Sequence, residues 1–347
     1  MKLADWVTAR VIIPSIIPVC LAIASPIYGF DTRFASGKSA LAIPFELDDN
    51  NVDNHIYIHV SVNDSPPLSF VLDTGASHTI LSLRNARSFG MGLQLVGKAT
   101  DATGTAPPDA YLVTDKVSLS LPGVTLSDQW LVAMSLDMTQ DCIGGAGDRG
   151  IDRVVPSGEG VDRKTRRVVD GILGANFFSS FVVEIDYAAR LINLYDPQSY
   201  KYTGKGKTIP LEIDPKYAFV QAQVKAPGRP PVTARLIVDT GGGAALWLTK
   251  QFTEAHKLLP PAEKLTPFID CGAGGSAKEK SWTGSLEGLQ LGGFKLSNPT
   301  AVFYQEPAIQ GSDGLLGNPA LRNFKVIFDY SRSRMILEPP RRVRGNN

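Results

Sequence analysis

Two aspartates in this sequence stand where paired acid–base chemistry is possible, because each follows a short apolar run and begins an Asp-Thr-Gly segment. The segments are Asp73–Gly75 and Asp239–Gly241. Aspartate is common in turns, so one such segment alone is weak evidence of a site. Two carboxylates in one site repel each other and hold one proton over a wide pH range. One member then takes a proton from water while the other polarises a carbonyl, which predicts hydrolysis without a metal or cofactor.

The residues after each aspartate suit a close approach of two chain segments. Thr74 and Thr240 carry hydroxyls that can bond to the backbone of the opposite segment. Gly75 and Gly241 lack a Cβ, so the backbone can turn tightly and approach its partner. We therefore expect the two aspartates to be catalytic and these threonines and glycines to support the dyad.

An internal duplication places the two aspartates at corresponding positions. Phe70–Gly75 recurs 166 positions later as Leu236–Gly241, and Gly171–Gly174 recurs 143 positions later as Gly314–Gly317. These spacings are too long for a solenoid repeat and indicate two domains of one fold. The offsets differ by 23 residues. We assign this excess to an exposed inserted loop within residues 141–169, which are rich in glycine and charge.

The elements that carry these segments are predicted to be mostly short strands. The chain has 347 residues, which suits two domains, and its 33 glycines and 24 prolines indicate many turns. Residues 55–62 and 217–224 have the pattern of strands. Helices are expected only at 83–90, at 250–257 and after each Gly-Ile-Leu-Gly-like motif. The predicted fold class is all-β, in two homologous lobes.

The motifs resemble those of a known family, the aspartic proteases. Phe70–Ser77, with the later Gly171–Gly174, is most similar to the retropepsin-like branch, which includes bacterial aspartyl proteases. Two copies in one chain resemble the bilobal, pepsin-like arrangement. The resemblance covers about residues 40–340. It implies two β-barrel-like lobes with a cleft between them, and an extended peptide lying across that cleft.

Roles follow from this resemblance for matching positions. Asp73 and Asp239 would form the catalytic dyad, the two threonines would grip the opposite lobe, and the Gly-Ile-Leu-Gly-like motifs would close a loop beneath each aspartate. The family also has β-hairpin flaps. Candidates are residues 99–111, with Thr103 and Gly104 at the tip, and residues 270–282, which include Gly274. For Tyr111 and Trp282, the nearby aromatic residues, a place in the core is the ordinary expectation.

One departure separates the two sites and motivates a second hypothesis. The first site continues as Ala76-Ser77, whereas the second continues as Gly242-Gly243. Three successive glycines loosen that turn and remove any side chain that could bond to the second aspartate. The leading prediction is an aspartic endopeptidase acting on peptides or proteins as a single-chain pseudo-dimer, a monomer. The alternative is a catalytically weak peptide-binding protein with the same fold. Pairing of each lobe with another chain is unnecessary when both lobes are fused.

The N-terminus predicts export. Lys2 and Arg10 precede an apolar stretch that is short and interrupted by prolines, and Ala22–Ala24 has a small-x-small pattern before a cleavage site. The expected location is periplasmic or secreted, with an uncleaved membrane anchor as the alternative, and no stable span is expected after cleavage. The mature chain keeps Cys142 and Cys271, for which pairing and free thiols both stay open. The predicted divisions are a signal peptide (1–24), an N-terminal segment (25–40), lobe one (41–203), lobe two (204–340) and a tail (341–347).

Other classes of function find little support. The formal net charge of +1 argues against nucleic-acid binding, which needs a strong basic field. His55 and His59 lie at even spacing on a predicted strand but lack a third ligand. We therefore expect an exposed strand face there rather than a metal site.

Overall fold

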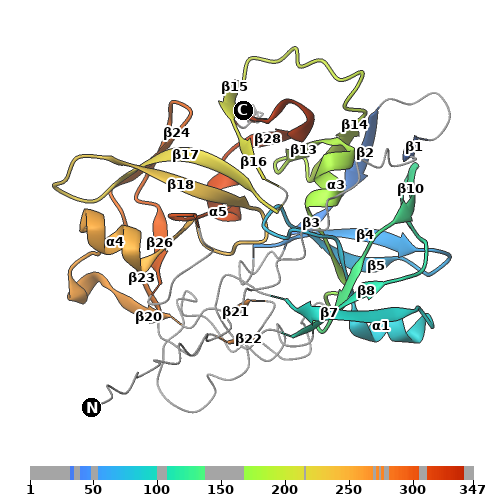
Figure 1. Ribbon diagram of the computed structural model, residues 1–347. Helices are drawn as coiled ribbons and strands as arrows, with labels where there is room; N and C mark the ends of the chain where they lie inside the picture. Colours follow the sequence, from blue (N-terminus) through green and yellow to red (C-terminus); the bar gives the residue numbers. More distant parts are fainter. Residues whose placement is uncertain are drawn as a thin grey trace, which may run out of the picture.

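The computed structural model shows a chain built mostly of β-strands, with two lobes that stand side by side in Figure 1. The residues it describes are 32–34, 40–47, 54–99, 108–136, 168–214, 216–268, 271–272, 275–276, 281–304 and 311–339.

The first lobe is organised around one large sheet, which has eleven strands within the described residues. In sheet order these are β1 (Thr32–Phe34), β10 (Val124–Gln129), β9 (Val117–Leu121), β4 (Ile56–Val62), β5 (Leu68–Leu72), β12 (Gly171–Leu173), β6 (Ile80–Ser82), β11 (Val132–Met134), β8 (Asp109–Val113) and β7 (Leu93–Lys98), with β3 (Glu46–Leu47) paired to β4. The sheet mixes antiparallel pairs with a parallel pairing of β5 and β12 at its centre.

The second lobe repeats this sheet, with ten strands in the described part of the chain. They are β20 (Thr266–Phe268), β23 (Ser281–Ser285), β26 (Thr300–Phe303), β19 (Leu246–Leu248), β27 (Gly314–Gly317), β18 (Val232–Asp239), β17 (Ala218–Lys225), β24 (Gly288–Leu291) and β25 (Phe294–Ser297), with β16 (Glu212–Ile213) paired to β17. A small separate hairpin joins β21 (Cys271–Gly272) to β22 (Gly275–Ser276).

The strand registers reproduce the sequence repeat. Leu72 pairs in parallel with Leu173, and the equivalent Val238 pairs with Leu316. Neighbour order is also conserved, since β4–β5–β12–β6–β11–β8 corresponds to β17–β18–β27–β19–β26–β23. The all-β, two-lobed fold class is confirmed.

A third sheet, which the sequence patterns did not predict, joins the lobes across the top of the view in Figure 1. Its order in the described residues is β15 (Lys207–Pro210), β29 (Arg334–Glu338), β28 (Lys325–Asp329), β13 (Val182–Asp186), β14 (Leu191–Tyr195) and β2 (Ala40–Pro44). The central strands β13 and β28 are antiparallel, and Glu184 faces Ile327. These two residues are equivalent in the repeat, so the pseudo-twofold axis passes between them.

The short helices lie where they were predicted. They are α1 (Leu83–Ser88), α3 (Ala175–Ser180), α4 (Lys250–His256) and α5 (Asn318–Leu321), and the 3₁₀ turns are η2 (Ala262–Lys264) and η3 (Tyr330–Arg332). Ser82 and Thr249 cap α1 and α4 by accepting a backbone N–H, as short hydroxyl side chains do at helix N-termini. Among the described helices, none is both long and apolar enough to cross a membrane.

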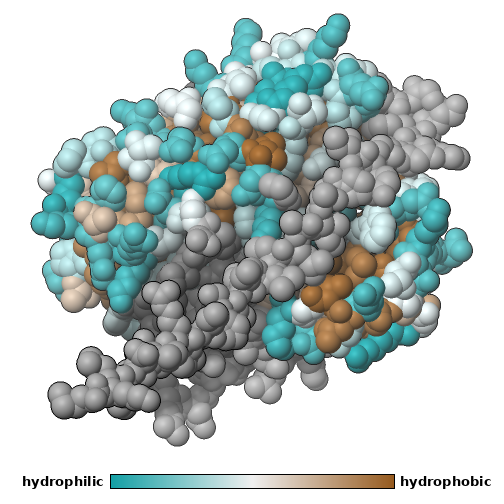
Figure 2. All heavy atoms as spheres, viewed as in Figure 1, coloured by the Kyte–Doolittle hydropathy of each residue, from teal (hydrophilic) through white to brown (hydrophobic). Residues whose placement is uncertain are grey.

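The hydrophobic core is continuous through both lobes and the joining sheet. Phe178 of α3 packs edge-to-face on Phe328 at 5.5 Å between centroids and stacks on Tyr330 at 5.8 Å. Side chains of the first lobe thus pack directly on the second. In the view of Figure 2, one group of apolar side chains shows over the lower part of the first lobe, where Figure 1 has β7 and α1. Leu95 of β7 and Phe89 after α1 are exposed.

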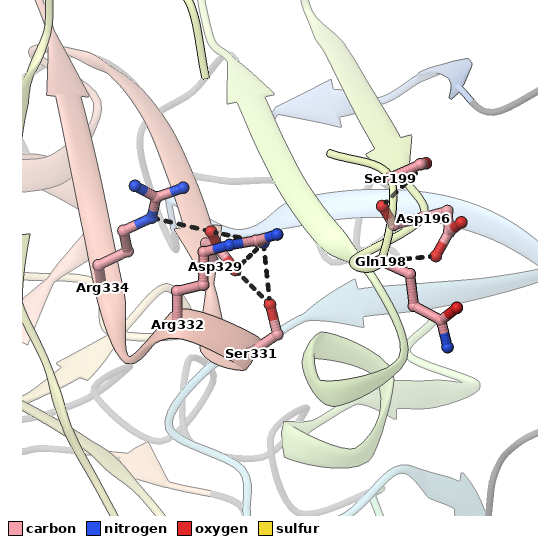
Figure 3. A network of polar contacts seen from close by, with 7 residues as sticks. All are labelled: Asp196, Gln198, Ser199, Asp329, Ser331, Arg332 and Arg334. Atoms are coloured by element: carbon pink, nitrogen blue, oxygen red, sulfur yellow. Dashed lines mark hydrogen bonds and ion pairs between the residues drawn. The ribbon is translucent and has the colours of Figure 1, made fainter. Parts of the chain in front are cut away.

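The buried carboxylate of Asp329, at the end of β28, bonds to the start of the next strand, β29 (Figure 3). Asp329 is fully buried and accepts a bond from Arg334 Nε at 2.8 Å. Ser331 and Arg332 also bond to this carboxylate. Asp196, at the end of β14, accepts the backbone N–H of Gln198 at 2.9 Å and closes a turn nearby. Burying a charge is costly unless it is paired, and Asp329 meets that requirement.

Candidate active site

The two Asp-Thr-Gly segments meet where the lobes join. Asp73 directly follows β5, and Asp239 ends β18. Both strands lie at the centre of their sheets, so the buried leucine, valine and isoleucine side chains before each aspartate fix its position. Both aspartates are half-buried.

The threonines bond to each other's segments with twofold symmetry. The backbone N–H of Thr74 donates to Thr240 Oγ1 at 3.0 Å, and the N–H of Thr240 donates to Thr74 Oγ1 at 3.0 Å. Each hydroxyl in turn donates at 2.8 Å to the opposite strand, Thr74 to the carbonyl of Val238 and Thr240 to that of Leu72. Both side chains are fully buried. Four bonds therefore hold the two loops at one separation.

The glycines of the two segments face the aspartates of the opposite lobe. A Cβ added to Gly75 would lie 2.6 Å from Asp239 Oδ1, and one added to Gly241 would lie 2.6 Å from Asp73 Cγ. Real Cβ atoms do not come so close to other heavy atoms, so only glycine fits. This reciprocal packing brings the two carboxylates together at the pseudo-twofold axis.

Backbone amides and burial set the electrostatics of the pair. The N–H of Gly75 donates to Asp73 Oδ1 at 2.7 Å, and that of Gly241 donates to Asp239 Oδ1 at 2.9 Å. Burial, followed by the charge of Asp73 and a hydrogen bond to it, holds the pKa of Asp239 well above its usual range. The hydrogen bond from the amide of Gly241 opposes that rise in pKa. The arrangement favours one shared proton.

The later glycine motifs close a loop under each aspartate. A Cβ on Gly174 would lie 2.2 Å from the carbonyl oxygen of His78, and one on Gly317 would lie 2.0 Å from that of Ala244. The residues that follow bond to the same loops, since the N–H of Ala175 donates to Ala76 O at 2.9 Å and that of Asn318 to Gly242 O at 3.0 Å. Each Asp-Thr-Gly loop is thus supported from below by a strand–helix junction.

Comparison with known families agrees with this geometry. Residues 58–177 and 220–320 match the model of a family described as aspartyl protease. The chain is a member of the aspartyl protease family. The two matched regions fall one in each lobe and each includes one Asp-Thr-Gly segment. No curated protein matches the chain.

The run of glycines after Asp239 in this member of the aspartyl protease family has a packing reason. A Cβ on Gly242 would lie 2.8 Å from Trp247 Cζ3, and one on Gly317 would lie 2.7 Å from the same atom. Trp247 is buried in β19 beneath the second loop. The absence of side chains at these two glycines therefore makes room for a large ring under Asp239.

One sequence expectation was wrong. His55 does not lie on an exposed strand face, because its Nε2 bonds to the carbonyl oxygen of Gly241 at 2.8 Å across the two lobes. His59 is exposed, and its Nε2 lies 3.3 Å from Glu46 Oε1. Sequence spacing alone could not place His55 beside the second loop, because the contact depends on how the lobes pack.

A second residue beside the dyad was also missed. Tyr217 is half-buried directly before β17. Its pKa is raised, first by burial and then by the charges of Asp214, Asp73 and Asp239. The only sequence signal was its place at the start of the strand equivalent to residues 55–62.

The flap candidates are described in part. β7 and β8 form an antiparallel hairpin, which continues through a bond from Ala99 N to Pro108 O, but Thr103 and Gly104 lie outside the described residues. In the second lobe β21 and β22 form a hairpin, and Gly274 between them also lies outside. Tyr111 and Trp282, the aromatic residues near the two flap candidates, pack against the core as expected.

Other sequence predictions fall on residues that the structure does not describe. These are the signal peptide, the inserted loop around 141–167, Cys142 and the C-terminal tail; for Cys271 only the backbone is described. The boundaries of the lobes stay predictions.

Proposed function

We propose that this member of the aspartyl protease family is an endopeptidase in which Asp73 and Asp239 together activate one water against a peptide bond. The observation that carries the proposal is the reciprocal packing of each Asp-Thr-Gly glycine on the opposite aspartate. A dyad has to lie within reach of one water, and this packing supports that requirement.

The division of labour follows from the electrostatics. The raised pKa of Asp239 favours it as the member that holds the shared proton, and Asp73 then acts as the base. Asp73 takes a proton from water as the water oxygen attacks the carbonyl carbon. Asp239 donates its proton to the carbonyl oxygen, forming a neutral tetrahedral diol. Collapse of the diol breaks the C–N bond, and the nitrogen leaves with a proton from the dyad.

We further propose that the protein is an exported monomer. Both aspartates belong to one chain, which supports a monomer acting as a pseudo-dimer on peptide or protein substrates. The predicted signal peptide supports export to the periplasm or the medium.

Cleavage of a peptide library from about pH 3 to pH 8, roughly the range in which carboxylate dyads titrate, tests the function. Wild type should cleave, whereas Asp73→Asn and Asp239→Asn should each lose about 10²–10⁴-fold in kcat, because each removes one partner of the proton transfer. Product masses identify the cleaved bonds. A wild type that binds peptides but cleaves none would favour the peptide-binding alternative and overturn the enzyme proposal.

A further inference from the structure

His55 and Tyr217 occupy equivalent places in the two lobes. Each directly precedes the strand that pairs with its Asp strand, and Tyr57 and Phe219 pair with equivalent residues there. Each ring meets the aromatic ring two residues later edge-on, with centroids 6.1 Å apart for His55–Tyr57 and 6.3 Å apart for Tyr217–Phe219. The pseudo-symmetry therefore sets an imidazole in one lobe against a phenol in the other.

The bond made by His55 leads directly to the second aspartate. A carbonyl oxygen only accepts, so His55 Nε2 must carry the proton that it donates to Gly241 O at 2.8 Å. Gly241 also donates its own N–H to Asp239 Oδ1 at 2.9 Å, whereas the next N–H, that of Gly242, donates to the backbone carbonyl of Asp239 at 3.2 Å. His55 thus holds, by its carbonyl, the residue whose N–H bonds to the Asp239 carboxylate.

Neighbouring bonds hold His55 in place. Asn54 donates from Nδ2 to Gly243 O at 3.0 Å, so two successive side chains of the first lobe grip the second loop. Arg322 donates to Asn54 Oδ1 at 2.8 Å, and Asn318 of α5 donates to the backbone carbonyl of Asn54. Asn54 has φ of 57°, a left-handed conformation that asparagine tolerates better than most residues.

We propose that His55 is a positioning residue that holds Gly241 by its carbonyl, so that the N–H of Gly241 stays on Asp239 Oδ1 and stabilises the charged form of that carboxyl. The proposal rests on the function proposed above and adds that the two aspartates are supported unequally. Tyr217 stands at the equivalent place in the second lobe, so the two sides of the dyad differ in chemistry although the loops are symmetric.

The charged groups around the two aspartates must be the same in every variant that is compared. In the described part of the chain, the titratable and charged side chains that act on the dyad or on the His55 bond include Asp73, Tyr217, Tyr330 and Arg322. Variants at His55 leave all of them unchanged, so a difference between the variants reports the His55 bond.

The test compares His55→Gln with His55→Leu. Glutamine places its amide Nε2 the same number of bonds from Cβ and keeps the donor, whereas leucine removes it. His55→Leu should lower kcat about ten-fold, the size of one hydrogen bond, with little change in KM. Both limbs of its pH profile should move up by about half a unit, because a less stabilised carboxylate has a higher pKa. His55→Gln should restore the rate and both limbs.

Two further measurements distinguish a failure of the His55 proposal from a loss of fold and from a failure of the proposed function. Thermal unfolding of both variants shows whether a lower rate reflects lost fold. If wild type cleaves nothing, the function fails, and carboxyl ¹³C NMR titration, with signals assigned from the Asp→Asn variants, still reads the dyad. A higher dyad pKa in His55→Leu than in wild type and His55→Gln supports the positioning role. Equal values in all three, or a His55→Gln enzyme as slow as His55→Leu, would overturn it.

Discussion

Each aspartate of the dyad is faced by a glycine from the other lobe, and this contact leaves no room for even one methyl group. The sequence predicted the glycines because Asp-Thr-Gly occurs twice, at equivalent positions. It predicted the threonines for the same reason, and their four bonds are symmetric. His55 escaped prediction because its bond to Gly241 joins residues 186 positions apart and follows no repeat.

Gly75→Ala is expected to abolish most activity. Its methyl group would lie 2.6 Å from Asp239 Oδ1, so the loops must separate, and a displacement of about 1 Å at a catalytic group costs roughly 10²-fold in rate. Peptide cleavage at the pH optimum measures the loss. Gly288→Ala is the matched control, since its nearest neighbour would be Leu296 O at 3.6 Å, an ordinary contact. Full activity in Gly75→Ala would contradict the reciprocal packing.

The strand and loop elements beneath the two aspartates are equivalent but not identical. The aspartates are 166 positions apart, whereas the capping residues Ser82 and Thr249 are 167 apart. The second lobe therefore holds one extra residue between its loop and β19, and Trp247 fills the space below. Repeats and turn residues predicted the strands at 55–62 and 217–224, the strands before each aspartate, and the four helices of the described residues. They could not predict which ring packs under Gly242, because that depends on strand register.

A double-mutant cycle tests the contact between Gly242 and Trp247. Gly242→Ala alone should destabilise the fold by about 1–3 kcal/mol, because its Cβ would overlap the indole at 2.8 Å. In a Trp247→Leu background the same change should cost much less, since the ring is gone. Urea unfolding of the four proteins gives the coupling energy. Additive effects would show that the missing side chain at Gly242 has another cause.

The whole molecule is a pair of lobes joined by a sheet to which both contribute, and the dyad lies at their junction. The sequence predicted two homologous lobes but not the joining sheet. Its outer strands β2 and β15 come from the start of each repeat and its central strands from the end, so its pairing is set by how the lobes dock rather than by local pattern.

This placement makes the stability of the chain depend on pH. Burial and Asp73 raise the pKa of Asp239, so the folded chain holds its proton more tightly than the unfolded chain. The folded state is therefore favoured fully below the ordinary carboxyl pKa, and loses stability as pH rises toward the raised value. Each pH unit in that interval costs about 1.4 kcal/mol. Asp239→Asn should flatten the decline in unfolding free energy between about pH 4 and pH 7, the interval above the ordinary carboxyl pKa.

Urea unfolding at several pH values measures this slope. Asp64→Asn, a change at an exposed aspartate, is the control and should keep the wild-type slope. An Asp239→Asn variant with an unchanged slope would contradict the linkage.

Glu184 and Ile327, the pair at the pseudo-twofold axis, show what the fusion of two lobes into one chain permits. In a symmetric dimer of identical single lobes, the residue on the axis would face its own copy. Two glutamates there would repel each other across the sheet. In the fused chain Glu184 instead faces Ile327 and accepts a bond from Asn193 at 2.9 Å, and Lys325 lies 3.7 Å away. Because both lobes belong to one chain, each position near the axis can carry a residue that differs from its twin, and residues 55 and 217 also differ.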